Sequence, residues 1–423
     1  MLDRRSAMLS RTEKGRSPVG NTFDVIVVGA RCAGSPLSML LARKGYQVLV
    51  VDRIGFPSDT MSTHLIHPPG VARLKRWGLL EQVTATGCPP VGTYAFDVGP
   101  FTIEGAPGTP DSPVAYGPRR TVLDKLLVDA AAAAGAEIRE RFVVDEIVRE
   151  GDRVTGIRGH DRAGDAVTES APLVVGADGL HSLVAKTVGA AQYNERPPLQ
   201  ASYYAYWSGL PMNGRFEAYD RGTRAFAAWP TNDDLTLIVG GWPAVEFDEN
   251  KRDVERHFMA ALDQAPAFAE RVRAATRVER FVGTAVPNYF RRPFGPGWAL
   301  VGDAGYNKDF ITAQGISDAF RDAELCATAI DETLSKGRPF DDAMGAYQAA
   351  RDQHAFPMYE FTCQFARMAP ASPEMQQLLA AVHGNQEAMN GFAGVFGGTT
   401  SPAEFFAPEH VGRIFAAARA SGV

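Results

Sequence analysis

The chain has 423 residues, with 43 lysines and arginines against 49 aspartates and glutamates, and a formal net charge of -6. This length predicts two or more intertwined domains, because a single hydrophobic core rarely grows so large. The acidic balance gives no reason to bind nucleic acid or an anionic membrane, and no apolar run could span a bilayer. The four cysteines form no C-x-x-C pair, so we expect neither a zinc site nor a disulfide framework, and a reducing cytoplasm fits best.

Residues 1–21 form a polar N-terminal segment that contains several basic side chains and lacks the apolar core of a secretory signal. We expect this segment to be a disordered tail. A transit peptide is the alternative, but Asp3, Glu13 and the missing amphipathic pattern disfavour it.

An apolar strand then runs into a glycine-marked turn. Residues 23–34 read FDVIVVGARCAG, and a helix is predicted over 36–44, followed by a strand over 48–51. The pattern is typical of the first βαβ unit of a dinucleotide-binding domain. Asp52 ends the second strand, where a ribose hydroxyl needs a hydrogen-bond acceptor.

The middle glycine of the usual G-x-G-x-x-G pattern is replaced by Arg31. One interpretation is that the motif is spurious. The other is that the Arg31 guanidinium lies over the pyrophosphate and adds to a helix N-terminus that already favours anions.

The next predicted elements continue the first domain and lead to another buried strand. The unalternating apolar run at 173–178 is typical of a strand buried on both faces of a parallel sheet. In chain order we predict a loop over 56–64, a helix over 69–83, a strand over 94–103, a connection over 105–113, a helix over 120–135, and strands over 142–149 and 154–159.

From residue 199 to 242 the pattern changes to aromatic strands, which predicts a largely antiparallel sheet inserted into the first architecture. The strand-into-glycine pattern then returns, and residues beyond Tyr347 are mainly helical. The predicted elements are strands over 202–207, 224–229 and 235–239, a helix over 254–265, strands over 279–286 and 298–302, a helix over 315–334, and a glycine-rich break over 391–398.

Two aspartates stand where buried strands end. Asp178 lies in VGADGLHS and Asp303 in LVGDA, at the edge where an open α/β sheet binds its ligand. A strand-end turn or a helix N-cap is the alternative role for each.

With these motifs in order, and an Arg-x-x-Leu-Asp helix beginning at Arg120, residues 24–347 resemble the class A FAD-dependent monooxygenases of the para-hydroxybenzoate hydroxylase type. Flavin halogenases and geranylgeranyl reductases are relatives of that family. The resemblance implies an α/β fold with a Rossmann-like FAD-binding domain, an inserted, largely antiparallel substrate domain and a helical C-terminal region. The corresponding ranges are 22–90, 112–190 and 287–350 for the FAD-binding domain, 91–111 and 191–286 for the substrate domain, and 351–423 for the C-terminal region.

The resemblance also implies which residues hold FAD. Asp303 would bind the ribityl chain, Asp178 and Gly179 would serve FAD and in some members nicotinamide access, and a helix near Gly315 would direct N–H groups at the reduced flavin. The full set of expected cofactor-binding residues is Gly29, Arg31, Cys32, Ala33, Gly34, Asp52, Arg53, Arg120, Asp178, Gly179, Gly302, Asp303, Gly315 and Ile316.

The segment 302–315 departs from the family pattern G-D-A-A-H-x-x-x-P-x-x-G-x-G, since Tyr306 and Phe310 replace histidine and proline and the glycine after them is missing at 312–313. The resemblance assigns no catalytic residue, but Lys308, Phe310 and Thr312 are candidates because they would lie beside the flavin. Phe310 is expected to pack on substrate, with simple volume filling as the alternative. Lys308 could act on an oxidant or an anionic substrate group, and a solvated loop is the alternative for Lys308 and Asp309.

Aromatic residues of the inserted sheet are the candidates for a substrate pocket. Strand alternation means that only about half of them can point inward, and an ordinary core position is the alternative for each. His64 and His67 lack a third ligand nearby, so we expect loop hydrogen bonds or a contact near the flavin rather than a metal site. The candidate pocket residues are Tyr204, Tyr206, Trp207, Phe226, Trp229 and Phe310.

The implied activity is an FAD-dependent monooxygenase that uses NAD(P)H and O2, through an oxygen adduct at flavin C4a, to hydroxylate or epoxidise a hydrophobic, aromatic small molecule. Flavin halogenation is one alternative, although the W-x-W-x-I-P signature is absent. A double-bond reductase of the geranylgeranyl reductase type and a ligand-binding protein without turnover are the others. We expect a monomer or homodimer with no nucleic-acid or membrane partner.

Overall fold

The computed structural model describes residues 23–420, so the tail predicted over 1–21 lies outside the described part. A six-stranded sheet forms the first layer, in the order β20-β21-β11-β1-β2-β7, and every pairing is parallel except that of β20 with β21. Its strands are β1 (Val25–Val28), β2 (Val48–Asp52), β7 (Glu137–Glu140), β11 (Leu173–Gly176), β20 (Phe294–Gly295) and β21 (Trp298–Leu300).

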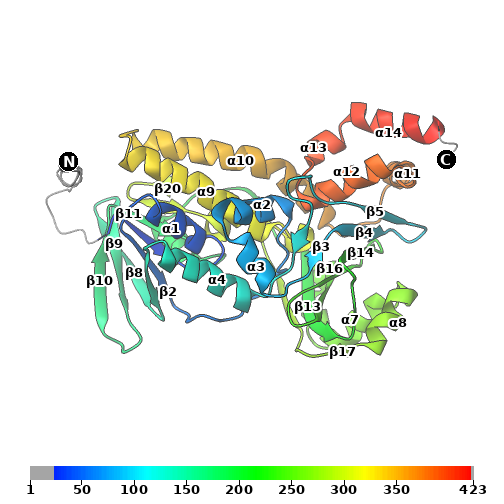
Figure 1. Ribbon diagram of the computed structural model, residues 1–423, viewed down its shortest axis with the longest axis horizontal. Coiled ribbons are helices and arrows are strands. Elements are labelled where there is room, and N and C mark those ends of the chain that lie inside the picture. Colours follow the sequence, from blue (N-terminus) through cyan, green and yellow to red (C-terminus); the bar gives the residue numbers. More distant parts are fainter. Residues whose placement is uncertain (1–22, 421–423) are drawn as a thin grey trace, which may run out of the picture.

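Both faces of this sheet are covered, which explains why its central strands are apolar throughout. Val25 and Val27 pack into the helix-covered core, while Ile26 and Val28 pack toward a three-stranded sheet on the other face. The covering helices are α1 (Gly34–Ala42), α2 (Pro68–Trp77), α3 (Leu80–Ala85), α4 (Arg120–Ala133), α9 (Gly315–Leu334) and α10 (Phe340–Phe365) (Figure 1). The opposite face holds β8 (Val143–Glu150), β9 (Arg153–His160), β10 (Ala166–Ser170) and α5 (Leu183–Val188).

An eight-stranded sheet forms the second layer, and its pairings are antiparallel except for β14 with β4. Helices α7 (Val254–Leu262) and α8 (Pro266–Ala274) cover one of its faces. The other face packs on the C-terminal helices, as Figure 1 shows at the right of the molecule. The strands are β4 (Thr93–Asp97), β5 (Thr102–Gly105), β13 (Gln200–Ser208), β14 (Arg215–Asp220), β15 (Ala225–Pro230), β16 (Leu235–Pro243), β17 (Thr276–Arg277) and β18 (Val282–Ala285).

Short elements connect the layers and complete the C-terminal region. Strands β12 (Gln192–Arg196), β19 (Asn288–Arg291) and β22 (Tyr306–Asn307) form a small sheet, and β3 (Pro90–Val91) pairs with β6 (Ala115–Tyr116). The remaining helices are α6 (Phe247–Asn250), α11 (Pro373–Val382), α12 (Gln386–Gly397), α13 (Pro402–Phe405) and α14 (Pro408–Ala420), with short 3-10 turns η1 (Ala244–Glu246), η2 (Gly302–Ala304) and η3 (Phe310–Thr312).

The predicted fold class is confirmed, and the errors concern local breaks. The helix predicted over 69–83 is two helices, because Gly78 adopts a left-handed conformation and ends α2. The strand predicted over 94–103 is the hairpin of β4 and β5. The glycine-rich break predicted over 391–398 lies largely inside α12, which ends at Gly397 with Gly398 as its left-handed C-cap.

The two large sheets divide the chain much as the predicted domains do, although the exact domain limits stay predictions. All four cysteines are buried and free. Among residues 23–420, no helix combines the length and apolar composition that a membrane crossing requires.

Candidate functional site

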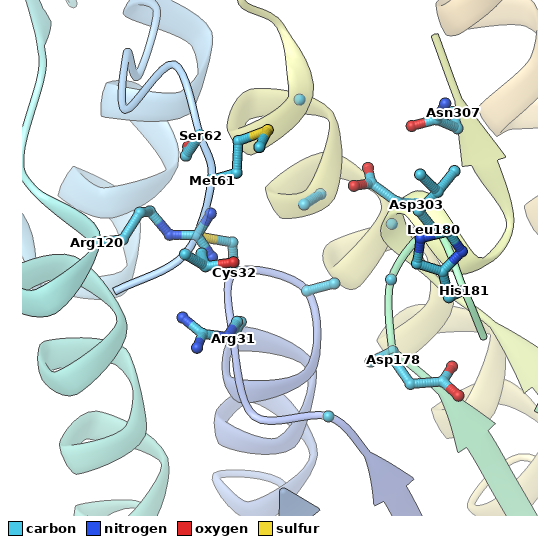
Figure 2. Close-up of a pocket in the computed structure, with 18 of the residues that line it drawn as sticks. Arg31, Cys32, Met61, Ser62, Arg120, Asp178, Leu180, His181, Asp303 and Asn307 are labelled. Atoms are coloured by element: carbon cyan, nitrogen blue, oxygen red, sulfur yellow. The ribbon is translucent and has the colours of Figure 1, made fainter. Parts of the chain in front are cut away.

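A cavity of about 780 Å³ lies between the carboxyl ends of the parallel strands and the eight-stranded sheet. This volume is within the range of small-molecule and cofactor sites. Its walls come from the β1–α1 turn, the end of β2, the loop before α2, Arg120 of α4, the β11–α5 turn, the segment from η2 to the start of α9, and strands β13, β16 and β18. Figure 2 shows Arg31, Arg120 and Met61 on one side of the cavity and Asp303, Leu180 and His181 on the other.

The β1–α1 turn passes so close to the β11–α5 turn that only glycine fits. At Gly29 φ is +103°, and a Cβ atom would lie 2.4 Å from the Ala177 carbonyl oxygen. The Asp52 carboxylate joins this turn to the end of β2 by accepting from the Ala30 N–H (2.8 Å) and the Ile54 N–H (2.9 Å). Each Asp52 oxygen keeps a lone pair, so a ribose hydroxyl could still donate to it.

A fully buried carboxylate, Asp124 of α4, organises the basic side chains of the wall. Arg31 forms an ion pair with Asp124 and donates to the Ser58 hydroxyl at 2.9 Å. Arg120 Nε donates to the other Asp124 oxygen at 2.9 Å, and the Cys32 thiol contacts that same oxygen at 3.4 Å. Two guanidinium groups therefore share one carboxylate, which leaves an excess positive charge beside the turn. From the sequence, Asp124 was named only as the last residue of the Arg-x-x-Leu-Asp motif and was given no role, although its spacing of four residues from Arg120 on a helix indicates an ion pair.

Asp178 caps the start of helix α5, which was the alternative role given for it in the sequence analysis. Its carboxylate accepts from the Ser182 hydroxyl (2.5 Å) and the Leu183 N–H (2.7 Å) at the start of α5. Figure 2 shows this carboxylate directed away from Arg120. Gly179 and the following Leu180 and His181 nevertheless line the cavity, so the backbone of this turn is the part that faces a ligand.

Asp303 lies in the cavity wall across from Arg120, and its side chain is exposed to the cavity. Among the described residues no hydrogen-bond donor contacts its carboxylate, while its backbone oxygen accepts from the Tyr289 hydroxyl at 3.0 Å. Desolvation inside the enclosing cavity raises the pKa of Asp303 to about 6, against the opposing effect of Arg120. Nearby, α9 begins at Gly315, where a Cβ atom would meet no other atom within 4 Å. The N-terminus of α9 therefore opens onto free space.

The segment after Asp303 is buried, so the solvated-loop interpretation of Lys308 and Asp309 is wrong. Lys308 forms an ion pair with Asp318 in the first turn of α9, and Asp318 also pairs with Arg321 at 2.6 Å. Asp309 accepts from the Ile311 N–H at 3.0 Å, and burial raises its pKa to about 7.

The other two residues predicted to lie beside the flavin, Phe310 and Thr312, differ in position. Phe310 lines the cavity, whereas Thr312 does not. The Thr312 hydroxyl bonds to the Thr362 hydroxyl at 2.8 Å, and its carbonyl oxygen accepts from His67 Nε2 at 3.0 Å. Both His67 and His64 form hydrogen bonds within the loop and the core. His64 Nε2 is bonded to the Tyr206 hydroxyl at 2.5 Å. No cluster of at least three His, Cys, Asp or Glu side chains able to hold a metal occurs within 23–420.

Of the five predicted aromatic pocket residues on the sheet, the structure brings only Tyr204 to the cavity. Trp207 and Phe226 point to the opposite face and pack under α7 and α8, as alternation along a strand requires. Tyr206 and Trp229 share the face of Tyr204 but lie in the core beyond the cavity. The sheet residues that do line it with Tyr204 are Ser202, Leu237, Val239, Thr284 and Val286, which carried no aromatic or charge signal in the sequence.

Comparison with known proteins gives one matching family model and several similar proteins. A family model described as "FAD binding domain" matches residues 22–362. The chain is 26% identical over 399 residues to Protein FixC of Salmonella typhi, covering 85% of this chain and 89% of that protein. It is 24% identical over 337 residues to digeranylgeranylglycerophospholipid reductase 2 of Methanococcoides burtonii, covering 77% of this chain and 79% of the reductase.

Solved structures share the fold at lower identity. The myxobacterial chondrochloren halogenase CndH superposes with a TM-score of 0.76 at 21% identity, covering 90% of this chain and all of that one. PqsL of Pseudomonas aeruginosa, described as a probable FAD-dependent monooxygenase, has a TM-score of 0.68 at 22% identity, covering 87% and 98%.

Proposed function

The chain belongs to the FAD-binding domain family and is an FAD-dependent oxidoreductase, and on this basis we propose that it is a monooxygenase. The proposed reaction uses NAD(P)H and O2 to hydroxylate or epoxidise a hydrophobic, aromatic small molecule. The observation that carries this proposal is one continuous cavity that joins the glycine turn to a neutral wall containing Tyr204 and Phe310. We further propose a cytoplasmic monomer or homodimer.

The residues at the nucleotide end suit FAD. Asp303 offers a carboxylate that faces the cavity without a donor among the described residues, which matches the hydroxyl groups of a ribityl chain. The glycine turn leaves its backbone accessible beside the excess positive charge of Arg31 and Arg120, which matches a pyrophosphate. The free space before Gly315 lies at the positive end of α9, which matches a ring that carries negative charge when reduced.

FAD, when bound, would supply the redox chemistry between NAD(P)H and O2. The N–H groups at the start of α9 stabilise negative charge, and Asp52 and Asp303 orient hydroxyl groups. Phe310 and the sheet wall hold an apolar substrate and exclude water, so no protein nucleophile is required.

Three measurements test the proposal in order. Purified protein should take up FAD and become yellow, whereas protein that stays colourless with added FAD would contradict every flavin interpretation. NAD(P)H oxidation should then rise with one or more members of a panel of aromatic metabolites. Finally, product formed under 18O2 should carry one labelled oxygen atom.

A double-bond reductase is the second candidate, favoured by the similarity to digeranylgeranylglycerophospholipid reductase 2. It predicts product formation without O2 and no label from 18O2. Halogenation is the third, favoured by the shared fold with CndH, and it predicts a brominated product only when bromide is present. Flavin uptake with none of these products would favour a binding protein.

A further inference from the structure

The wall of the cavity that faces away from the glycine turn carries no charge of its own. Strands β13, β16 and β18 contribute this wall, and none of their residues is Lys, Arg, His, Asp or Glu. Their registers place Ser202 beside Thr284 and Tyr204 beside Val239. The wall therefore presents hydroxyl groups and apolar side chains on one continuous face.

The cation that follows η2 in the cavity lining is already neutralised. Lys308 lines the cavity, but its ammonium group is paired with Asp318, and both side chains are largely buried. Arg321 pairs with Asp318 and Asp322, so the cluster holds two cations and two anions. Asp309 next to Lys308 can only add negative charge. The other charged lining groups belong to turns of the six-stranded sheet and to α4, at the nucleotide end.

We propose, resting on the function proposed above, that the substrate is uncharged and that Asp318 prevents Lys308 from binding a carboxylate. A substrate carboxylate in this part of the cavity would lose its hydration and find no unpaired cation, since Lys308 is paired with Asp318 and Arg120 with Asp124. That loss is strongly unfavourable. A neutral hydroxyl or carbonyl group would instead find the hydroxyls of Ser202, Tyr204 and Thr284. The site thus selects by charge as well as by shape.

The first test compares matched neutral and anionic probes on the FAD-loaded wild-type protein. The pairs are benzamide with benzoate, 4-hydroxybenzamide with 4-hydroxybenzoate, and 2-naphthamide with 2-naphthoate, and binding is followed by perturbation of the flavin absorbance. We expect each amide that binds to do so at least ~30-fold more tightly than its carboxylate. Equal or tighter binding of the carboxylates, or no binding of any amide up to its solubility, would overturn the proposal.

The second test removes the partner of Lys308. Asp318→Asn should tighten carboxylate binding ~10-fold or more while amide binding changes by less than about twofold. Asp322→Asn is the matched control, because it removes the same charge from the same cluster but does not line the cavity. Equal effects of the two variants, or no effect of Asp318→Asn, would show that Asp318 does not control the charge preference.

A third test does not depend on the folding of the buried cluster. Thr284→Lys places an unpaired cation on the wall at edge strand β18 and should shift preference toward the carboxylates. Thr276→Lys is the control, since Thr276 is exposed on β17 away from the cavity. An unchanged preference in Thr284→Lys would contradict the charge argument. Failure of the wild-type protein to take up FAD or to incorporate oxygen from 18O2 would instead contradict the proposed function. The failure of the charge proposal and the failure of the proposed function are therefore distinguishable.

Discussion

Replacing Asp124 by asparagine tests whether this buried carboxylate holds the basic wall of the cavity together. The variant keeps the size of the side chain but leaves Arg31 and Arg120 without their shared anion. Removing one partner of a buried ion pair typically costs about 3–5 kcal/mol. We expect the lower end, about 3 kcal/mol, because the Arg31 side chain is 22% exposed and keeps its bond to Ser58.

The assay is equilibrium urea unfolding of the apoprotein, followed by tryptophan fluorescence and circular dichroism. A loss of 3 kcal/mol corresponds to a ~100-fold change in the unfolding equilibrium. Asp129→Asn is the matched control on the same helix, because Asp129 is 59% exposed and pairs with Lys125 at the surface. That control should cost about 0.5 kcal/mol or less.

Saturating FAD should reduce the loss in Asp124→Asn, since the pyrophosphate offers the two guanidinium groups another anion. An apoprotein that loses less than about 1 kcal/mol, or no more than the Asp129 variant, would refute the reasoning. Asp124 would then be an ordinary helix residue, and the excess positive charge of the wall would not depend on it.

Three further predictions follow from the same geometry. Gly29→Ala should weaken FAD binding ~10-fold or more in a flavin fluorescence titration, because Gly29 has a positive φ and lies against the Ala177 carbonyl oxygen. Gly45→Ala is the control and should leave FAD binding unchanged, because Gly45 also has a positive φ but lies in open space. The raised pKa of Asp309 means that its stabilising effect is complete below pH ~4 and is lost as pH rises through about 7, so Asp309→Asn should gain stability relative to wild type between pH 5 and 8; a constant difference would refute this. Trp207→Ala should cost about 3–5 kcal/mol in urea unfolding without altering probe affinity, while Tyr204→Phe should alter probe affinity with little loss of stability, and the reverse result would contradict the placement of these two side chains.

Local patterns in the sequence were sufficient for the strands, the glycine turn and the two strand-end aspartates. Each of these depends on neighbouring residues: an unalternating apolar run indicates a strand buried on both faces, and glycine indicates a left-handed turn. The errors in the predicted elements arose where the sequence analysis misplaced the end of a helix at a glycine. Gly78 ends a helix within a continuous apolar pattern, while Gly391 and Gly394 are tolerated inside α12 because it packs on the hairpin of β4 and β5.

For the site residues, too, local sequence patterns predicted some features and missed others. Residue type alone could not say which aromatic side chains reach the cavity, because strand alternation sends Tyr204 and Trp207 to opposite faces. Nor could it show that Lys308 is neutralised by Asp318.

By itself, then, the sequence determined the fold class and the family. Only the tertiary structure decided that Arg31 is paired with a carboxylate 93 residues away, that Asp178 caps a helix, and that the far wall of the cavity is uncharged. The reason is physical: turns and strand periodicity depend on adjacent residues, whereas ion pairs and cavity walls depend on sheet register and on the packing of distant elements.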